Sequence, residues 1–167
     1  PRDLITVITR WNDLSGAIGA EHILADELPT LREAHTVVMT PTLRPLTAEP
    51  PIRQGNFAFR SFTLPETSLD EFLELCASAW PGFESAYDSQ IIGMWRHQGG
   101  LEGEVKCLLL TRRPNLAMWE RSKIPENPEE AEVRRKLSRR YDLCTDTDVF
   151  TTTLLTAKDT QDMARWT

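Results

Sequence analysis

The chain has 167 residues, of which 40% are hydrophobic and 26% charged, and this composition fits one globular domain or a small domain with an appended half. Its formal net charge of −6 argues against a nucleic-acid surface, because a basic patch is needed to neutralise phosphates. No run approaches the roughly 18 apolar residues of a membrane span, and no apolar leader opens the chain, so we expect a cytoplasmic protein without a membrane span.

The first fifty residues predict a βαβ element, which we treat as a separate N-terminal part, residues 1–50. The β-branched run Leu4–Thr9 predicts a strand, and the apolar spacing over Ile18–Leu28 predicts a helix. Thr36–Met39 predicts a short second strand. Four prolines then fall between residues 41 and 51, so we expect residues 41–55 to be a connector that cannot be a central strand.

The second part opens with a predicted strand at 56–64 and a predicted amphipathic helix. Ser68 and Glu71 have the spacing of a capping box, which would start the helix. The apolar positions that follow form one stripe at helical spacing and predict a helix packed on a sheet: Leu69, Phe72, Leu73, Cys76 and Trp80.

Two strands are predicted next, Gln90–His97 and Glu104–Thr111, and the glycine-rich loop between them favours an antiparallel hairpin. A short helix is predicted over Asn115–Ser122. Asn127 and Pro128 then have the pattern of a helix start.

The end of that last helix carries a basic run from Arg134 to Arg140. Cations are favoured at a helix C-terminus, so a solvated helix end is the simpler interpretation, and an anion-binding face is the alternative. Val149–Leu155 predicts the last strand, and we interpret residues 158–167 as a tail.

An internal repeat would link the two parts. Residues 28–35 and 80–87 align without gaps in their proline, their alanine and their hydrophobic or aromatic positions. The first part would then be an incomplete copy of the second, although chance explains so short a match equally well.

The cysteines and histidines predict neither a metal nor a redox site. Cys76, Cys107 and Cys144 are widely spaced without a CxxC pair, so we expect buried, reduced thiols. The three histidines show no HxH or HExxH spacing. Because GxSxG, P-loop and GxGxxG motifs are also absent, we expect neither a metal nor a cofactor.

Three segments resemble the NIPSNAP family. Phe57–Leu64, with Arg60-Ser61-Phe62-Thr63-Leu64, is similar to the family's opening strand, and Ile92-Gly93-Met94-Trp95-Arg96 is similar to its second strand. Residues 134–143 resemble the basic helix before its last strand. The resemblance covers residues 56–157. The chain departs from the family pattern at Ala58 and in the third strand, which carries Arg112 and Arg113.

The resemblance implies an α+β fold, namely a ferredoxin-like βαββαβ domain of the dimeric α+β barrel superfamily, in which an antiparallel sheet has helices on one face. In that superfamily two sheets face each other, either across a homodimer or within a tandem pair. The element order that patterning predicts from residue 56 agrees with this fold. We therefore expect a homo-oligomer, most simply a homodimer.

Arg60 is the first candidate site residue. Strand alternation places it on one face with Ala58 and Phe62, and an arginine on an apolar face needs a partner. Glu102 or Glu104 could supply one, and so could the carboxylate or carbonyl of a ligand.

The second strand of the domain offers His97 as a candidate acid or base, with Trp95 and Gly93 on the same face. A core tryptophan and a rim histidine are the alternative interpretation. Phe62 and Tyr87 complete the expected substrate pocket, although Tyr87 most simply opens a turn.

Two functions remain open. In the first, an apolar cleft binds a hydrophobic organic molecule, Arg60 orients its carbonyl or carboxylate group, and His97 moves a proton in a cofactor-free reaction of the proton-transfer, oxygenase or cyclase type. In the second, the domain is a noncatalytic binding or assembly module of the NIPSNAP type whose cleft is filled by side chains.

Overall fold

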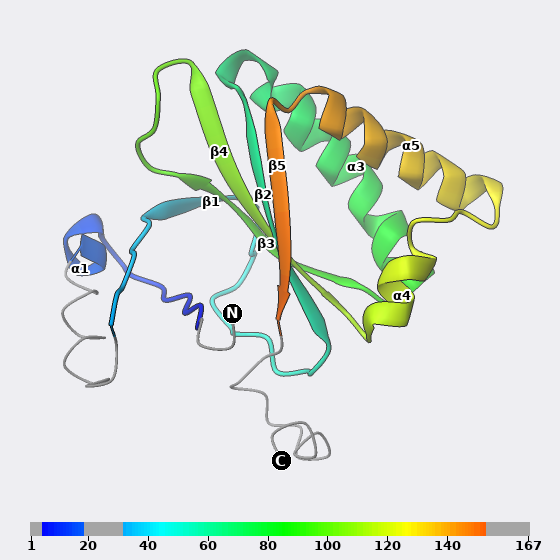
Figure 1. Cartoon of the computed structure of the whole chain (residues 1–167), viewed down its shortest axis with the longest axis horizontal. Coiled ribbons are helices and arrows are strands. Elements are labelled where there is room, and N and C mark those ends of the chain that lie inside the picture. The colour runs from blue at the N-terminus through cyan, green and yellow to red at the C-terminus, as the bar shows by residue number, and fades with distance from the viewer. Residues whose placement is uncertain (1–4, 19–31, 153–167) are drawn as a thin grey trace. The chain divides into compact units, whose positions relative to one another are not determined.

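The computed structural model describes residues 5–18 and 32–152 (Figure 1). The chain divides into two compact units, residues 1–39 and 40–167. In the first unit, α1 (Leu14–Ile18) begins after Asp13, whose carboxylate accepts hydrogen bonds from the Ser15 hydroxyl and the Gly16 amide at 2.7 and 2.8 Å. Residues 5–9 form no strand, so that prediction is wrong.

A β-branched run alone does not make a strand, because a strand is stabilised by pairing with a neighbour in a sheet. Residues 5–9 have no such pairing in the part of the chain that the structure describes. Several predictions fall outside the described residues: Leu4, the helix after Ile18, half of the first repeat copy, and the tail at 158–167.

The second unit contains a five-stranded sheet with helices on one face (Figure 1). The strand order is β1-β3-β4-β2-β5. The strands are β1 (Met39–Arg44), β2 (Asn56–Pro65), β3 (Gln90–His97), β4 (Glu104–Arg113) and β5 (Asp146–Thr152). The helices are η1 (Glu66–Ser68), α3 (Leu69–Tyr87), α4 (Leu116–Arg121) and α5 (Pro128–Asp142).

The topology from β2 to β5 is the predicted ferredoxin-like βαββαβ. β2 is antiparallel to β4 and to β5, and β3 is antiparallel to β4. In the central pair, Arg60 lies opposite Leu109 and Phe59 opposite Leu110. The predicted α+β fold is therefore confirmed, and β1 adds an edge strand before the βαββαβ order begins.

β1 corrects the prediction for residues 36–44. The strand begins at Met39 rather than Thr36 and runs through Pro41, where a connector was expected. An edge strand tolerates proline because one side of its backbone needs no ladder donor. Thr42 Oγ1 donates to the Met94 carbonyl at 2.9 Å, and Arg44 pairs with Glu84 of α3 at 2.7 Å, so side chains also hold this strand.

The predicted capping box at Ser68 is wrong. Ser68 closes the 3-10 turn η1 with φ −97 and ψ −3, and its side chain makes no cap hydrogen bond to α3. A capping serine normally has an extended backbone, which turns its hydroxyl toward the free amides of the first helical turn. α3 continues through Pro81 and ends at Asp88, whose φ of 42 lies in the left-handed region.

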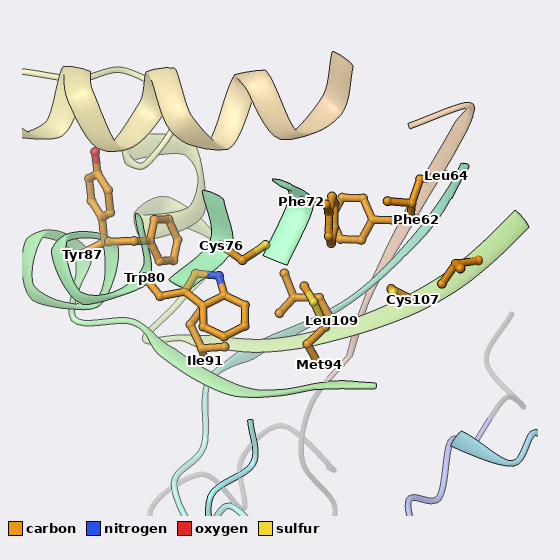
Figure 2. Close-up of a cluster of buried hydrophobic side chains, with 12 residues drawn as sticks. Phe62, Leu64, Phe72, Cys76, Trp80, Tyr87, Ile91, Met94, Cys107 and Leu109 are labelled. Atoms are coloured by element: carbon orange, nitrogen blue, oxygen red, sulfur yellow. The ribbon is translucent and has the colours of Figure 1, made fainter. Parts of the chain in front are cut away.

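Two apolar clusters cover the two faces of the sheet. On the helical face, the main core includes Phe62, Phe72, Trp80 and Met94, all at most 2% exposed (Figure 2). The opposite face carries a smaller buried cluster, with three partly buried hydrophobic residues packed against it: Phe57, Phe59 and Leu110, with Ile92, Trp95 and Leu108. Side-chain alternation along β2 and β4 therefore divides the sheet as the sequence predicts.

β5 begins three residues before the predicted Val149. The added residues include Asp146 and Asp148, which are exposed. Their polar side chains gave no strand signal in the sequence, although every residue of β5 pairs with β2. No helix in the described part of the chain is long and apolar enough to span a membrane.

Candidate functional site

A cavity of about 210 Å³ lies between the helical face of the sheet and the helices α3, α4 and α5. Apolar and aromatic side chains line much of it, including Trp80, Phe83, Leu109 and Trp119. Its charged lining residues, as far as the structure describes them, are all cations: Arg60, Arg113, Lys123, Arg134 and Arg140. A cavity with this lining is suited to a ligand that combines an apolar body with negative charge.

Arg140 is the most buried of these cations, with 4% of its surface exposed. Its guanidinium lies 4.6 Å from the ring centroid of Phe62, and its Nη1 donates to Cys76 Sγ at 3.4 Å. Its Nε is fully buried and has no acceptor among the described residues. A buried charge without a counter-charge is costly, so this guanidinium is arranged for a partner that the described chain does not supply.

Arg113 reaches the cavity from the end of β4 and is 9% exposed. Its guanidinium carbon lies 5.1 Å from the Phe83 ring and 5.3 Å from the Trp119 ring. Nη1 donates to Thr111 Oγ1 at 3.1 Å, and Nε is buried without a described acceptor. Burial, helped by the charge of Arg60, lowers the pKa of Arg113 from 12.5 to about 10.

Arg60 enters the cavity from the middle of β2, as the sequence predicts for that face. Its guanidinium lies 5.6 Å from the Tyr141 ring. The predicted partners Glu102 and Glu104 do not pair with it among the described ion pairs, because Arg60 lies opposite Leu109, five residues along β4 from Glu104. Burial is the main cause of its lowered pKa, and the neighbouring Arg140 lowers it further.

Another buried charge of this unit, Glu130, has a full set of partners. Glu130 is 6% exposed, and its carboxylate accepts two bonds from Arg121 Nη2, at 2.8 and 2.9 Å. It also accepts from the Glu126 amide and from Asn127 Nδ2. The hydrogen bond from Glu126 is the largest cause that lowers the pKa of Glu130. Glu130 thus has a counter-charge, whereas Arg113 and Arg140 have none among the described residues. Arg112, which is 5% exposed and does not line the cavity, also has no described ion pair and donates its Nε to the Gln54 carbonyl at 2.7 Å.

The predicted site residues are not brought together. Trp95 packs with the apolar cluster on the sheet face opposite the helices, whereas Arg60 lies on the helical face. His97 lies at the end of β3 in a separate shallow depression beside the hairpin loop. Burial, followed by the charge of Lys106, lowers the pKa of His97. His97 therefore faces away from the cavity that contains Arg60.

The two remaining pocket candidates belong to the core rather than to the cavity lining. Phe62 is fully buried, with the Arg140 guanidinium 4.6 Å from its ring centroid, and Tyr87 is 2% exposed. Figure 2 shows both side chains within the core cluster. The Tyr87 ring packs on Phe83, and its hydroxyl interacts with Arg121 and Glu130. Burial is the first cause that raises the pKa of Tyr87. Tyr87 thus ends α3, and the turn predicted after it follows at Asp88.

Sequence reasoning missed Arg113 and underrated Arg140. A signal for Arg140 was present, since the apolar positions of α5 and its end, Val133, Leu137, Tyr141 and Cys144, pack on the core at helical spacing. Arg140 lies seven residues after Val133 and therefore falls within this stripe rather than on the solvated face. Arg113 was missed because the predicted strand ended at Thr111. The strand runs to Arg113, and side-chain alternation then places Arg113 on the face of Leu109 and Thr111.

The described residues contain no group of three or more histidine, cysteine, aspartate or glutamate side chains that could hold a metal ion. The three cysteines are free. Cys107 is buried, and burial followed by the nearby Cys76 raises its pKa to about 11. A protonated, buried thiol is a poor nucleophile, so these residues behave as core side chains.

No family model matches the chain, and no curated protein matches it. It resembles an uncharacterized NIPSNAP domain protein from Burkholderia xenovorans, at 16% identity and a TM-score of 0.44, over 62% of this chain and 96% of that one. It also resembles the de novo designed protein Foldit4, at 13% identity and a TM-score of 0.39, over 61% and 99%. A candidate monooxygenase from Lactobacillus acidophilus is 11% identical, with a TM-score of 0.37 over 60% and 48%.

A NIPSNAP domain protein is thus among the solved structures similar to this chain, in agreement with the resemblance in the sequence. At these identities and TM-scores, no activity passes from those structures to this one.

Proposed function

We propose that the protein binds a small organic anion in the cavity between the sheet and the helices. One observation carries the proposal: Arg113 and Arg140 are buried in the cavity wall, and neither has a carboxylate partner among the described residues. A bound carboxylate would supply the counter-charge and accept charge-assisted hydrogen bonds, which are about twice as strong as neutral ones.

The size and the lining of the cavity limit the ligand. A volume of about 210 Å³ lies below the roughly 300–1,000 Å³ of typical ligand pockets, so the ligand is small. Trp80, Phe83, Leu109 and Trp119 offer apolar and aromatic surface to its body. The proposal therefore keeps the predicted substrate class, a hydrophobic molecule with a carboxylate or carbonyl group, and assigns its acidic group to arginines.

Binding rather than turnover is the function that we propose. A cofactor-free proton transfer needs an acid or a base within hydrogen-bond reach of the ligand. His97, the expected group, lies outside the cavity, so its pairing with Arg60 in one catalytic site has no geometric support. Tyr141 is the described lining residue whose hydroxyl could donate to a ligand carbonyl.

The proposal is tested by titrating small organic acids into the protein and measuring heat by calorimetry at pH 7.5. Aromatic and aliphatic monocarboxylates, dicarboxylates and their uncharged amides form the panel. We expect acids to bind and the matched amides to bind at least tenfold more weakly, about 1.4 kcal/mol. Arg140→Met should abolish the difference. The neighbouring Arg139→Met is the control, because Arg139 is exposed and pairs with Glu71. Equal affinity for acids and amides would refute the proposal.

A noncatalytic assembly role is supported by the sheet face opposite the helices. Phe57, Phe59 and Leu110 form an apolar cluster there, and Phe150, which stacks on Phe59 at 5.0 Å, remains 42% exposed. We propose that this face takes part in a homodimer, as the predicted barrel would require. Sedimentation should show a dimer that Phe150→Asp shifts toward monomer. A monomer at all concentrations would exclude the proposed dimer and leave the cavity proposal unaffected.

A further inference from the structure

The cavity presents its two most buried guanidinium groups at two separate places. Arg140 contacts Cys76 of α3 and Phe62 of β2, whereas Arg113 stacks on Phe83 of α3 and donates to Thr111 of β4. Each group is more than nine-tenths buried, and each has an Nε without an acceptor in the described chain. One carboxylate cannot neutralise both groups if they are far apart.

Two elements of the fold measure the separation. Cys76 and Phe83 are seven residues apart on α3, which is about 10 Å at the helical rise of 1.5 Å per residue. On the sheet, Thr111 lies opposite Ala58, and Ala58 is four residues from Phe62, which is about 13 Å at the rise of a strand. The two guanidinium groups, which we call the Arg140 pole and the Arg113 pole, are therefore on the order of 10 Å apart along the cavity wall.

Arg60 lies between these poles. Its partner across the sheet, Leu109, is halfway between Thr111 and the residue opposite Phe62. Arg60 also affects the protonation of Arg113 and is itself affected by Arg140, so the three charges act on one space. Trp80 adds a buried Nε1 without a described acceptor on the same wall. The described wall thus offers donors along its whole length and no carboxylate.

We infer that the ligand of this cavity carries two anionic groups, carboxylate or phosphate, joined by a short apolar spacer, with one group bound at Arg140 and the other at Arg113. The inference deepens the proposed anion binding and rests on it. Each acid oxygen would lie about 2.8 Å from a guanidinium nitrogen. The remaining space between the poles holds a spacer of a few carbon atoms, packed on Leu109 and Phe83.

The test compares matched acids by calorimetry at pH 7.5, where both groups of a dicarboxylate are ionised. Succinate, glutarate and adipate are each paired with the monocarboxylate of equal chain length. We expect the best diacid to bind at least tenfold more tightly than its monoacid. In Arg113→Met the ratio of diacid to monoacid affinity should fall to about twofold, because only the Arg140 pole remains. Replacing succinate by 3-phosphonopropionate distinguishes a phosphate group from a second carboxylate.

The outcomes separate this inference from the proposal beneath it. If diacids and monoacids bind equally in the wild type, the two-pole inference is wrong and anion binding survives. If no acid binds better than its amide, both fail. Arg113→Lys controls for a folding defect, because it keeps the charge but cannot form the bidentate hydrogen bonds of a guanidinium. Its ratio of diacid to monoacid affinity should lie between those of the wild type and Arg113→Met. An unchanged ratio in both Arg113 variants would remove that residue from the site.

Discussion

Replacing Arg113 by methionine should make the ligand-free protein more stable. The fall in its pKa from 12.5 to about 10 corresponds to a cost of about 3 kcal/mol for holding the charge at neutral pH. The change also removes the hydrogen bond to Thr111, worth about 1 kcal/mol, and the stacking on Phe83 and Trp119, worth about 1 kcal/mol. We therefore expect a net gain of about 1 kcal/mol in the free energy of unfolding.

The assay is equilibrium unfolding in urea, analysed with a common slope for the two proteins. The pKa of Arg113 is lowered in the folded state, so its charge destabilises the fold below about pH 10 and this penalty is relieved as the pH rises from there toward 12.5. The difference between variant and wild type should thus be constant from pH 7 to 9. The half-exposed Arg96, paired with Glu66 at 2.7 Å, is the control, and Arg96→Met should lower the free energy of unfolding by at most about 1 kcal/mol.

A loss of 2 kcal/mol or more in Arg113→Met would refute the reasoning, because it would show that the guanidinium stabilises the empty fold. The expected gain would mark Arg113 as a residue kept for binding at the expense of stability. A ligand that binds only the folded state raises the free energy of unfolding by mass action, and at Arg113 this gain should offset the cost of the buried charge. The wild type should therefore gain stability from a bound acid, and the variant should gain less.

Three further predictions concern other parts of the unit. NMR titration should give His97 a pKa below its usual 6.5, so the folded protein should lose stability as the pH falls from 6.5 through that lowered pKa. His97→Ala should leave acid binding unchanged, because His97 lies outside the cavity. Gly93→Ala should lower the free energy of unfolding in urea by about 1–3 kcal/mol, because the new methyl would overlap the Trp95 ring. Replacing Trp95 by a smaller side chain in the same variant should recover part of the loss. A thiol reagent at pH 8 should modify the half-buried Cys144 first and Cys107 only after denaturation; rapid reaction of Cys107 in the native state would contradict its burial.

The fold from β2 onward could be predicted because local pattern and tertiary packing agree there. The helical stripe of α3 and the alternation of β2 each place apolar side chains on one core. The strand predicted in the N-terminal part is wrong for the opposite reason: residues 5–9 favour a strand locally, but no described strand pairs with them. Pro41 led to the opposite error, a connector predicted where the structure has a strand, because only the sheet order shows that this strand lies at an edge and tolerates proline.

The site was less predictable than the fold, since it depends on which way side chains point at the ends of elements. Arg60 lies in mid-strand, so alternation placed it correctly. Arg140 belongs to a basic run whose charges suit a helix end, and that local explanation concealed its place in the buried stripe. His97 and Trp95 were predicted to lie on the same face of their strand. The sequence does not indicate whether that face is the helical face of the sheet, on which Arg60 lies.

The composition of the two sheet edges has a consequence for growth of the sheet. β1 carries Pro41 in its middle, and a strand with proline is a poor template for another chain. At the other edge, β5 exposes Asp146 and Asp148, whose charges would repel a second copy of the same strand. Addition of further strands is therefore disfavoured at both edges of the sheet. Self-association would have to use another surface, such as the partly exposed apolar face, and would not extend the sheet into a fibril.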